Sequence, residues 1–363
     1  MITVHVGLHK TGSSSIQVFF RTSQKRIFPN HLFLGDGGLR VPGTGTFAES
    51  RSRVHGLIID RAISSTPNVV LSSENFIGSH WKDLYANAAA HAVSIRNFCL
   101  PRGAFQVVLY LRPQLSWLES SYIQTIKSGH FWDAESYALA KLSNSRLYFS
   151  ILVQELIDAV GHEHLVVRPY TKSGDVVTDF LAVIGMSGTR VKLTELSREN
   201  LALNAGDVEL LRLVNRSTPW LRHEAVRQLK KREMNVAFGS MSCFPVSIQE
   251  RLREISLDDW TATASLLSKT QKFSANEFMK ALDDPSAKDV RPFIGDYLAA
   301  DYMHSRLAQL DLGTTQRGAR KSVDGRPASF FERAKGFKKL LRGKSSYEVL
   351  IRALESGKHT YHR

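Results

Sequence analysis

The chain has 363 residues, of which 43% are hydrophobic, a formal net charge of +14 and two cysteines. This length and composition are typical of one large globular domain with additions, or of two smaller domains. Because Cys99 and Cys243 stand alone, neither a disulfide framework nor a Cys/His metal site is implied. The sequence also lacks the run of roughly 18 uncharged apolar residues of a membrane span, and no signal-peptide pattern precedes the first strand. We therefore expect a cytoplasmic protein that uses no metal.

The positive charge is concentrated in the last 51 residues. Residues 313–363 contain thirteen Lys and Arg residues and four acidic residues, a net charge of +9, whereas the other 312 residues carry +5. Aromatic and leucine side chains lie among these lysines, at Phe330, Phe331, Phe337, Leu340 and Leu341. This composition fits a solvated tail, and it equally fits an amphipathic arm that binds anionic lipid or a polyanionic substrate. No nucleic-acid recognition motif accompanies the charge, so we expect no nucleic-acid partner.

Strand-like and helical patterns alternate through the first half of the chain. The strand patterns cover residues 2–8, 69–73, 105–111 and 165–168, and the helical patterns cover residues 14–22, 54–63, 84–99, 116–127 and 147–160. This alternation predicts an α/β fold with a three-layer core, in which helices cover both faces of a central parallel sheet. Ligands of such folds bind at the carboxyl ends of the strands. The glycine-rich stretch 35–46 is a predicted loop on the acceptor side of that site.

Strand patterns disappear beyond about residue 190, and helical periods dominate at 208–215, 223–232, 248–255 and 296–312. We therefore predict an α/β core at residues 1–190, a helical C-terminal half of the same domain at 191–312, and a basic tail at 313–363.

The turn after the first strand is the most informative segment. Apolar residues alternate with polar ones up to Val6, and Gly7-Leu8-His9-Lys10-Thr11-Gly12-Ser13-Ser14-Ser15 then leads into a helix. A helix N-terminus attracts anions, because its first N–H groups lack acceptors and its dipole is positive there. Gly12 permits close backbone approach, the hydroxyls add donors, and Lys10 adds a point charge. This turn is a predicted site for a phosphate or a similar oxyanion.

Two common nucleotide-binding motifs do not fit this turn. A phosphate loop of the NTPase type has its Lys after the second glycine, but here Lys10 precedes Gly12. The dinucleotide fingerprint Gly-x-Gly-x-x-Gly is missing from the turn as well. The order His-Lys-Thr-Gly-Ser-Ser-Ser instead resembles the 5′-phosphosulfate loop of the sulfotransferases that use 3′-phosphoadenosine 5′-phosphosulfate (PAPS).

A second segment strengthens this resemblance. Arg112 ends the predicted strand 105–111, Ser120 follows eight residues later, and Tyr122 lies two residues beyond. The 3′-phosphate motif of the same family is also an Arg at a strand end with a Ser eight residues on. A guanidinium fork and a hydroxyl can converge on one phosphate. Pro113 is a departure, since many members have Asp or Asn between the Arg and the proline.

The resemblance covers about residues 1–215, with weaker similarity to bacterial members at 166–170, 177–185 and 198–200. It implies a PAPS-dependent sulfotransferase with a P-loop-like fold. In that family pattern Lys10 would stabilise the bridging and sulfuryl oxygens, and Arg112 and Ser120 would hold the 3′-phosphate. The 5′-phosphate would be held by Lys10, Thr11, Gly12, Ser13, Ser14 and Ser15.

Two residues are candidates for the base that deprotonates the acceptor hydroxyl. Glu74 follows the predicted strand 69–73, and related sulfotransferases often have a Glu after the second strand. The alternative for Glu74 is a purely structural role, as a turn cap or as the partner of a basic neighbour. His9 is the second candidate, although a His in this loop more often helps to hold the phosphosulfate. His5 is expected in the core.

The acceptor is expected to be a hydroxyl of a carbohydrate or glycolipid, on family analogy alone. Two other functions stay open at this point. One is a nucleotide-dependent kinase that acts on a small molecule, and the other is a non-catalytic nucleotide-binding protein. The second of these would use its basic tail on membranes, and the tail is also expected to allow peripheral contact with the inner face of an anionic membrane.

Overall fold

A computed structural model describes most of the chain. The described residues are 1–27, 31–35, 60–61, 64–81, 84–170, 175–186, 203–217, 219, 222–231, 241–268, 275–280, 282 and 290–293. They belong to two compact units, one from 1–121, 139–199 and 247–290 and the other from 122–138, 200–246 and 291–363. The predicted loop 35–46 beyond Gly35, most of the predicted helix 54–63, the predicted helix 296–312 and the basic tail lie outside the described residues. The predicted division at residues 190 and 312 stays a prediction.

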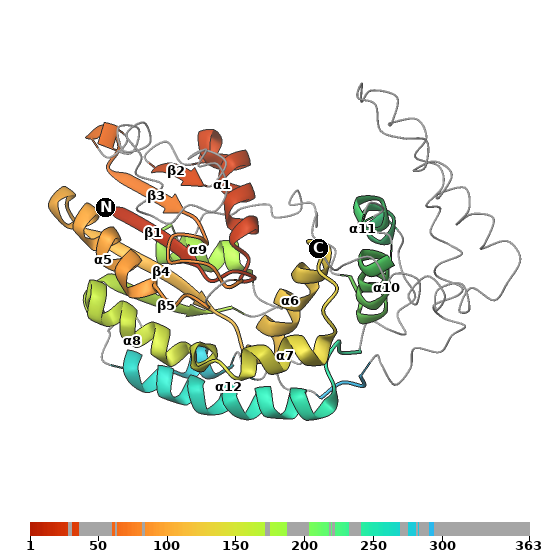
Figure 1. Ribbon diagram of the computed structural model, residues 1–363. Coiled ribbons are helices and arrows are strands. Elements are labelled where there is room, and N and C mark those ends of the chain that lie inside the picture. The colour runs from red at the N-terminus through yellow and green to blue at the C-terminus, as the bar shows by residue number, and fades with distance from the viewer. Residues whose placement is uncertain are drawn as a thin grey trace, which may run out of the picture. The chain divides into compact units, whose positions relative to one another are not determined.

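The first unit contains a five-stranded, all-parallel sheet in the order β2-β3-β1-β4-β5 (Figure 1). Its strands are β1 (Ile2–Gly7), β2 (His31–Gly35), β3 (Asn68–Ser72), β4 (Phe105–Leu111) and β5 (Leu165–Pro169). β1 is central, so that Val4 pairs with Leu71 of β3 on one side and with Val107 of β4 on the other. Every residue of β1 and β4 is buried, as expected for a parallel sheet covered on both faces. The predicted α/β fold is confirmed.

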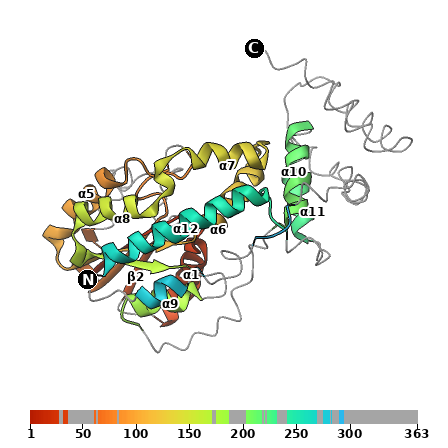
Figure 2. The same ribbon diagram turned by 90° about the horizontal axis from the view of Figure 1, so that it is seen from below.

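Helices of the first unit cover both faces of this sheet (Figures 1 and 2). α1 (Ser13–Ile27) and α9 (Val176–Val183) lie on one face, α5 (Ala88–Cys99) and α8 (Phe149–Val160) lie on the other, and α12 (Val246–Leu267) lies beside α8. The remaining short helices of this unit are η1 (Leu100–Arg102), η2 (Ser145–Leu147), η3 (His162–His164) and α13 (Ala275–Lys280). Phe20 of α1, Tyr110 of β4 and Phe180 of α9 belong to one buried cluster. Its burial fixes α1, and therefore the loop before α1, against the sheet.

Helix α6 (Gln114–Lys127) begins just after β4, and α12 holds its first residue. The backbone N–H of Gln114 donates to Ser256 Oγ at 3.2 Å, and its side-chain amide donates to Asp259 Oδ2. Asp259 also accepts from the backbone N–H groups of Phe149, at 2.8 Å, and Ser150, at 2.9 Å, at the start of α8. This carboxylate is 1% exposed, and it replaces water as the acceptor for N-terminal helix donors. α12 thereby fixes the start of the segment that follows β4.

The second unit is helical in its described part. It contains α10 (Ala205–Ser217), α11 (Arg222–Lys231) and the first residues of α7 (Ala134–Leu142). Asn215 donates from Nδ2 to the carbonyl oxygens of Ile126, at 2.6 Å, and His130, at 2.8 Å. The helical periods at 208–215 and 248–255 are confirmed as parts of α10 and α12, and the period at 223–232 is confirmed as far as Lys231, where α11 ends.

No helix in the described ranges combines the length and the apolar character needed to cross a bilayer.

Candidate functional site

The loop between β1 and α1 is the centre of the candidate site. Lys10 has φ of 67° and Gly12 has φ of 84°, so the chain turns through two left-handed residues before α1 begins. Only glycine fits the second position, because a Cβ on Gly12 would lie 2.8 Å from Val176 Cγ1. Thr11 Oγ1 donates to the carbonyl oxygen of Leu8 at 2.6 Å. The loop is thus closed by its own hydrogen bond and packed against α9.

The three serines of the loop differ in exposure. Ser13 is buried and its Oγ lies 3.4 Å from the carbonyl oxygen of Leu8, whereas Ser14 and Ser15 are exposed. Within the first helical turn the backbone N–H groups of Ser15 and Ile16 donate to the carbonyl oxygen of Gly12, at 2.9 Å and 3.2 Å, so the N–H groups of Ser13 and Ser14 are the ones available to an acceptor outside the helix. An external anion can therefore reach the first turn of α1 and the hydroxyls of Ser14 and Ser15. Thr11 and Ser13 shape the loop from inside.

Arg112 reaches the same loop from the end of β4. Its Nη1 donates to the carbonyl oxygen of Lys10 at 3.1 Å, and its Nε donates to Ser116 Oγ at 3.0 Å. Its guanidinium carbon lies 5.4 Å from the centre of the Tyr170 ring. The two motifs found in the sequence therefore meet in space. Arg112 supports the left-handed conformation of Lys10 in addition to carrying a positive charge beside it.

The serine that contacts Arg112 is Ser116, which the sequence analysis did not single out. Ser120 is half-buried and lies one helical turn further along α6. Residues four positions apart lie on the same face of a helix, so Ser116 was detectable from its spacing to both Arg112 and Ser120. A phosphate-binding role for Ser120 stays a prediction.

His9 is held at all four of its polar groups. Its backbone N–H donates to Tyr85 Oη at 3.2 Å, and its carbonyl oxygen accepts from Trp117 Nε1 at 3.0 Å. In the ring, Nδ1 lies 2.8 Å from Tyr85 Oη and Nε2 lies 3.2 Å from Asn75 Oδ1. His9 is 5% exposed, and this burial lowers its pKa to about 4. Tyr85, Asn75 and Trp117 are further site residues that no sequence motif identified.

Glu74 lies in the turn that follows β3, with its side chain 30% exposed. Its Oε1 is 4.0 Å from His9 Nε2, and a Cβ on Gly7 would lie 3.3 Å from Glu74 Cα, so this turn passes close to the end of β1. Burial lowers the pKa of Lys10, the negative charge of Glu74 opposes that change, and the positive charge of Arg112 adds to it. Two cations and one carboxylate therefore meet at the carboxyl ends of β1, β3 and β4.

These donors and charges fit a doubly anionic group. Lys10 and Arg112 supply two positive charges, and the first turn of α1 adds N–H and hydroxyl donors. Phosphate and sulfuryl oxygens are acceptors that such a set binds well, so the site fits the anionic part of a nucleotide such as PAPS. Across the described ranges, no group of three or more His, Cys, Asp and Glu residues is arranged as a metal site.

Arg168, which lies in the weakly similar segment 166–170, has an ion-pair partner within the fold. Arg168 on β5 forms an ion pair with Asp179 on α9, and Tyr110 Oη donates to Asp179 Oδ2 at 2.7 Å. Burial raises the pKa of Tyr110, so its hydroxyl stays protonated and donating. These contacts join β4 and β5 to α9, the helix that packs on Gly12. The other weak similarity, at residues 198–200, lies outside the described residues.

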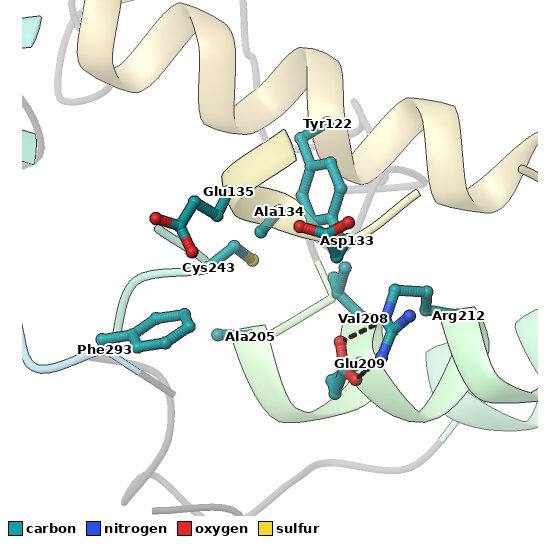
Figure 3. Close-up of a pocket in the computed structure, with 10 residues that line it drawn as sticks. All are labelled: Tyr122, Asp133, Ala134, Glu135, Ala205, Val208, Glu209, Arg212, Cys243 and Phe293. Carbon is teal, nitrogen blue, oxygen red and sulfur yellow. Dashed lines mark hydrogen bonds and ion pairs between the residues drawn. The ribbon is translucent and has the colours of Figure 1, made fainter. Parts of the chain in front are cut away.

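A cavity of about 230 Å³ lies within the second unit (Figure 3). Its wall includes Asp133, Glu135 and the ion pair between Glu209 and Arg212. Tyr122, which follows Ser120 in the segment that resembles the 3′-phosphate motif, lines this cavity, whereas none of the residues predicted to bind PAPS or to act as the base does. Because its carboxylates outnumber its arginine, this cavity is poorly suited to an anionic donor.

No protein-family model matches the chain, and no curated protein matches it. Among solved structures, a sulfotransferase from Alicyclobacillus acidocaldarius is similar, with a TM-score of 0.40 and 15% sequence identity. The match covers 74% of this chain and 96% of that one. A likeness of this extent says nothing of activity, and we infer the function from the residues of the site.

Proposed function

We propose that this chain is a sulfotransferase that moves a sulfuryl group from PAPS to a hydroxyl group of an acceptor. The observation that carries the proposal is the convergence of Lys10 and Arg112, which are 102 residues apart in sequence and joined by a 3.1 Å hydrogen bond. Each belongs to a segment that resembles one of the two phosphate-binding motifs of PAPS-dependent sulfotransferases. Positive side chains for both anionic groups of such a nucleotide are thus found at one loop.

Two groups of residues would bind the two anionic groups of PAPS. Lys10, the first turn of α1, and the exposed hydroxyls of Ser14 and Ser15 would bind the 5′-phosphosulfate. Arg112 and Ser120 would bind the 3′-phosphate. When bound, PAPS supplies the sulfuryl group. The protein contributes positioning and the neutralisation of negative charge, as proteins do in phosphoryl transfer.

Glu74 would take the proton of the acceptor hydroxyl. A hydroxyl is a poor nucleophile until a neighbouring base accepts its proton, and Glu74 is a partly exposed carboxylate beside Lys10. We infer that the acceptor is a carbohydrate or a glycolipid, which follows the family resemblance.

A comparison of two nucleotides tests the proposal. Calorimetric titrations of adenosine 3′,5′-bisphosphate and of ATP, run side by side, are expected to show tighter binding of the bisphosphate. Tighter binding of ATP would contradict the proposal and favour a kinase. Sulfation of an acceptor in the presence of PAPS then separates an enzyme from a non-catalytic binding protein.

Replacing Arg112 with Ala is expected to abolish the preference for a 3′-phosphorylated nucleotide. Loss of a charge-assisted, bidentate contact costs roughly 2–4 kcal/mol where water is excluded. The measurement is the ratio of the affinities for adenosine 3′,5′-bisphosphate and for AMP. A mutant with the same affinity ratio as the wild type would contradict the role of Arg112 in binding the 3′-phosphate.

The matched control for this prediction is Ser116→Ala. It removes the partner of Arg112 Nε and keeps the guanidinium. Arg112 also donates to the carbonyl oxygen of Lys10. Loss of the Arg112 side chain therefore weakens the binding of both nucleotides. The affinity ratio isolates the 3′-phosphate contact from this shared effect.

Removal of the basic tail is expected to weaken membrane attachment and leave nucleotide binding intact. Both nucleotide-binding segments precede residue 125, whereas residues 313–363 carry +9. Attachment of the full chain to anionic vesicles should weaken as salt is added, because the attraction is electrostatic. The measurement is vesicle co-sedimentation of the chain cut after Leu312. Equal vesicle binding by the truncated chain, or its failure to fold, would show that the tail has a structural role.

A further inference from the structure

The turn that follows β3 fixes which ring nitrogen of His9 carries the proton. Asn75 Oδ1 lies 3.2 Å from Nε2, and Glu74 Oε1 lies 4.0 Å from the same nitrogen. Both oxygens are acceptors, so Nε2 is the N–H group of the neutral ring. Tyr85 Oη then donates to Nδ1 at 2.8 Å and accepts from the backbone N–H of His9 at 3.2 Å. A single hydroxyl thereby holds both the ring and the backbone of this residue.

Neighbouring side chains disfavour a second proton on His9. The His80 ring centre lies 4.2 Å from that of His9, and His80 is 2% exposed. Within the described ranges, neither ring nitrogen of His80 has a hydrogen-bond partner. Lys10 is the adjacent residue, and Lys141 Nζ donates to the His80 carbonyl oxygen at 3.4 Å. Glu74 is a negative group on the Nε2 side, with Oε1 4.0 Å from that nitrogen.

We propose that Tyr85 is a positioning residue that holds His9 as a neutral Nε2–H donor and thereby leaves Glu74 as the base. With Nδ1 engaged by the Tyr85 hydroxyl and Nε2 protonated, His9 has no lone pair with which to accept a proton. The assignment of Glu74 as base rests on the proposed sulfuryl transfer. The tautomer of His9 does not depend on it.

Removal of the Tyr85 hydroxyl would free the Nδ1 lone pair. A hydrogen bond donated to that lone pair stabilises the neutral ring, so its loss raises the pKa of His9. The pKa of His9 in the intact site is about 4, and an unperturbed histidine titrates near 6.5. In Tyr85→Phe the value is expected to lie between these two, because burial and Lys10 still oppose the charged ring while the hydrogen bond to Asn75 favours it.

The direct test is the ¹⁵N spectrum of the histidine rings in the full chain without any nucleotide. The wild type is expected to show His9 as a single Nε2–H tautomer from pH 8 to pH 5.5. Tyr85→Phe is expected to show mixed tautomers and a titration at a higher pH than that of the wild type. The matched control is Tyr137→Phe, which removes another buried hydroxyl, one bonded to Thr125, and should leave the His9 signals unchanged.

An Nδ1–H tautomer in the wild type would overturn the proposal, and this measurement stands even where Tyr85→Phe fails to fold. Unchanged His9 signals in a folded Tyr85→Phe variant would overturn it as well. Both results are obtained without donor or acceptor, so they are distinct from a failure of the sulfotransferase assignment.

A kinetic readout separates positioning from a merely structural role. A raised pKa leaves a smaller fraction of His9 rings neutral at pH 5.5 in Tyr85→Phe than in the wild type. The ratio of Tyr85→Phe to wild-type turnover is therefore expected to fall between pH 8 and pH 5.5, while the ratio of bisphosphate affinities changes less. Parallel pH profiles for the two proteins would contradict the proposal.

Discussion

Glu74→Gln is expected to lower turnover by about 10²- to 10⁴-fold, the usual range for the loss of a general base. Gln keeps the shape of the side chain and removes its basicity. Glu74 contributes no donor to the anion-binding loop, so the affinity for adenosine 3′,5′-bisphosphate should stay nearly unchanged. The measurement pairs turnover on a working acceptor with the bisphosphate affinity from calorimetry.

The matched comparison is His9→Asn, which distinguishes the loss of a base from a disturbance of donor binding. His9 is anchored through Tyr85, Asn75 and Trp117, so a change there should disturb the neighbouring Lys10. Donor binding and turnover are therefore expected to fall together in His9→Asn. Loss of turnover at intact affinity in His9→Asn, with an active Glu74→Gln, would reverse the assignment of the base.

Acidification to pH 5 is expected to lower the free energy of unfolding by up to about 6 kcal/mol. Three histidines are buried in the neutral form, and burial lowers their pKa values to about 3 for His5, about 4 for His9 and about 2 for His80. Below pH 6.5 the unfolded chain binds protons at these sites and the folded chain does not. Stability is therefore present at neutral pH and is lost as the pH falls from 6.5 toward 4. Each histidine contributes about 2 kcal/mol at pH 5.

Urea unfolding at pH 7 and pH 5 measures this effect, and His5→Gln isolates one of its sources. His5 is fully buried and its Nδ1 lies 2.8 Å from Ser72 Oγ, which confirms the expected core position. A side chain that does not titrate at this position should reduce the difference between pH 7 and pH 5 by about 2 kcal/mol. Equal pH dependence in the variant and the wild type would contradict the neutral burial of His5.

The sequence predicted the features that depend on local pattern. The alternation of residues 2–6 and the Gly and Ser content of the following turn located β1 and the loop between β1 and α1. The apolar run at 105–111 located β4 and therefore Arg112 at its end. Because β1 and β4 are neighbours in a parallel sheet, placing both turns at the strand ends was sufficient to bring Lys10 and Arg112 together.

The features that the sequence missed depend on contacts between distant residues. Tyr85 and Asn75 contact His9 across 76 and 66 residues. No motif surrounds Tyr85, and Asn75 follows the candidate base Glu74 but was not itself predicted as a site residue. β2 is a five-residue edge strand that ends at Gly35. It was not predicted, and the glycine-rich pattern that begins at Gly35 indicated only a loop.

Helix α12 shows how buried polar residues hide a helical period. The apolar pattern predicted residues 248–255, whereas the helix runs from Val246 to Leu267. Ser256 and Asp259 interrupt the apolar pattern because both are buried as acceptors for the starts of α6 and α8. Polar residues with a capping role occupy positions that periodicity assigns to apolar ones.

The strand order has a consequence for the synthesis of the protein. Among the strands of the sheet β1 is synthesised first, whereas its two partners are β3, from residue 68, and β4, which ends at residue 111. At about 5–20 residues per second, this fully buried strand waits for several seconds with both edges unpaired. The acceptors Ser256 and Asp259 emerge much later still. Such edges are templates for aggregation, so a chaperone that covers β1 in the nascent chain would protect the strand that carries the loop of the candidate site.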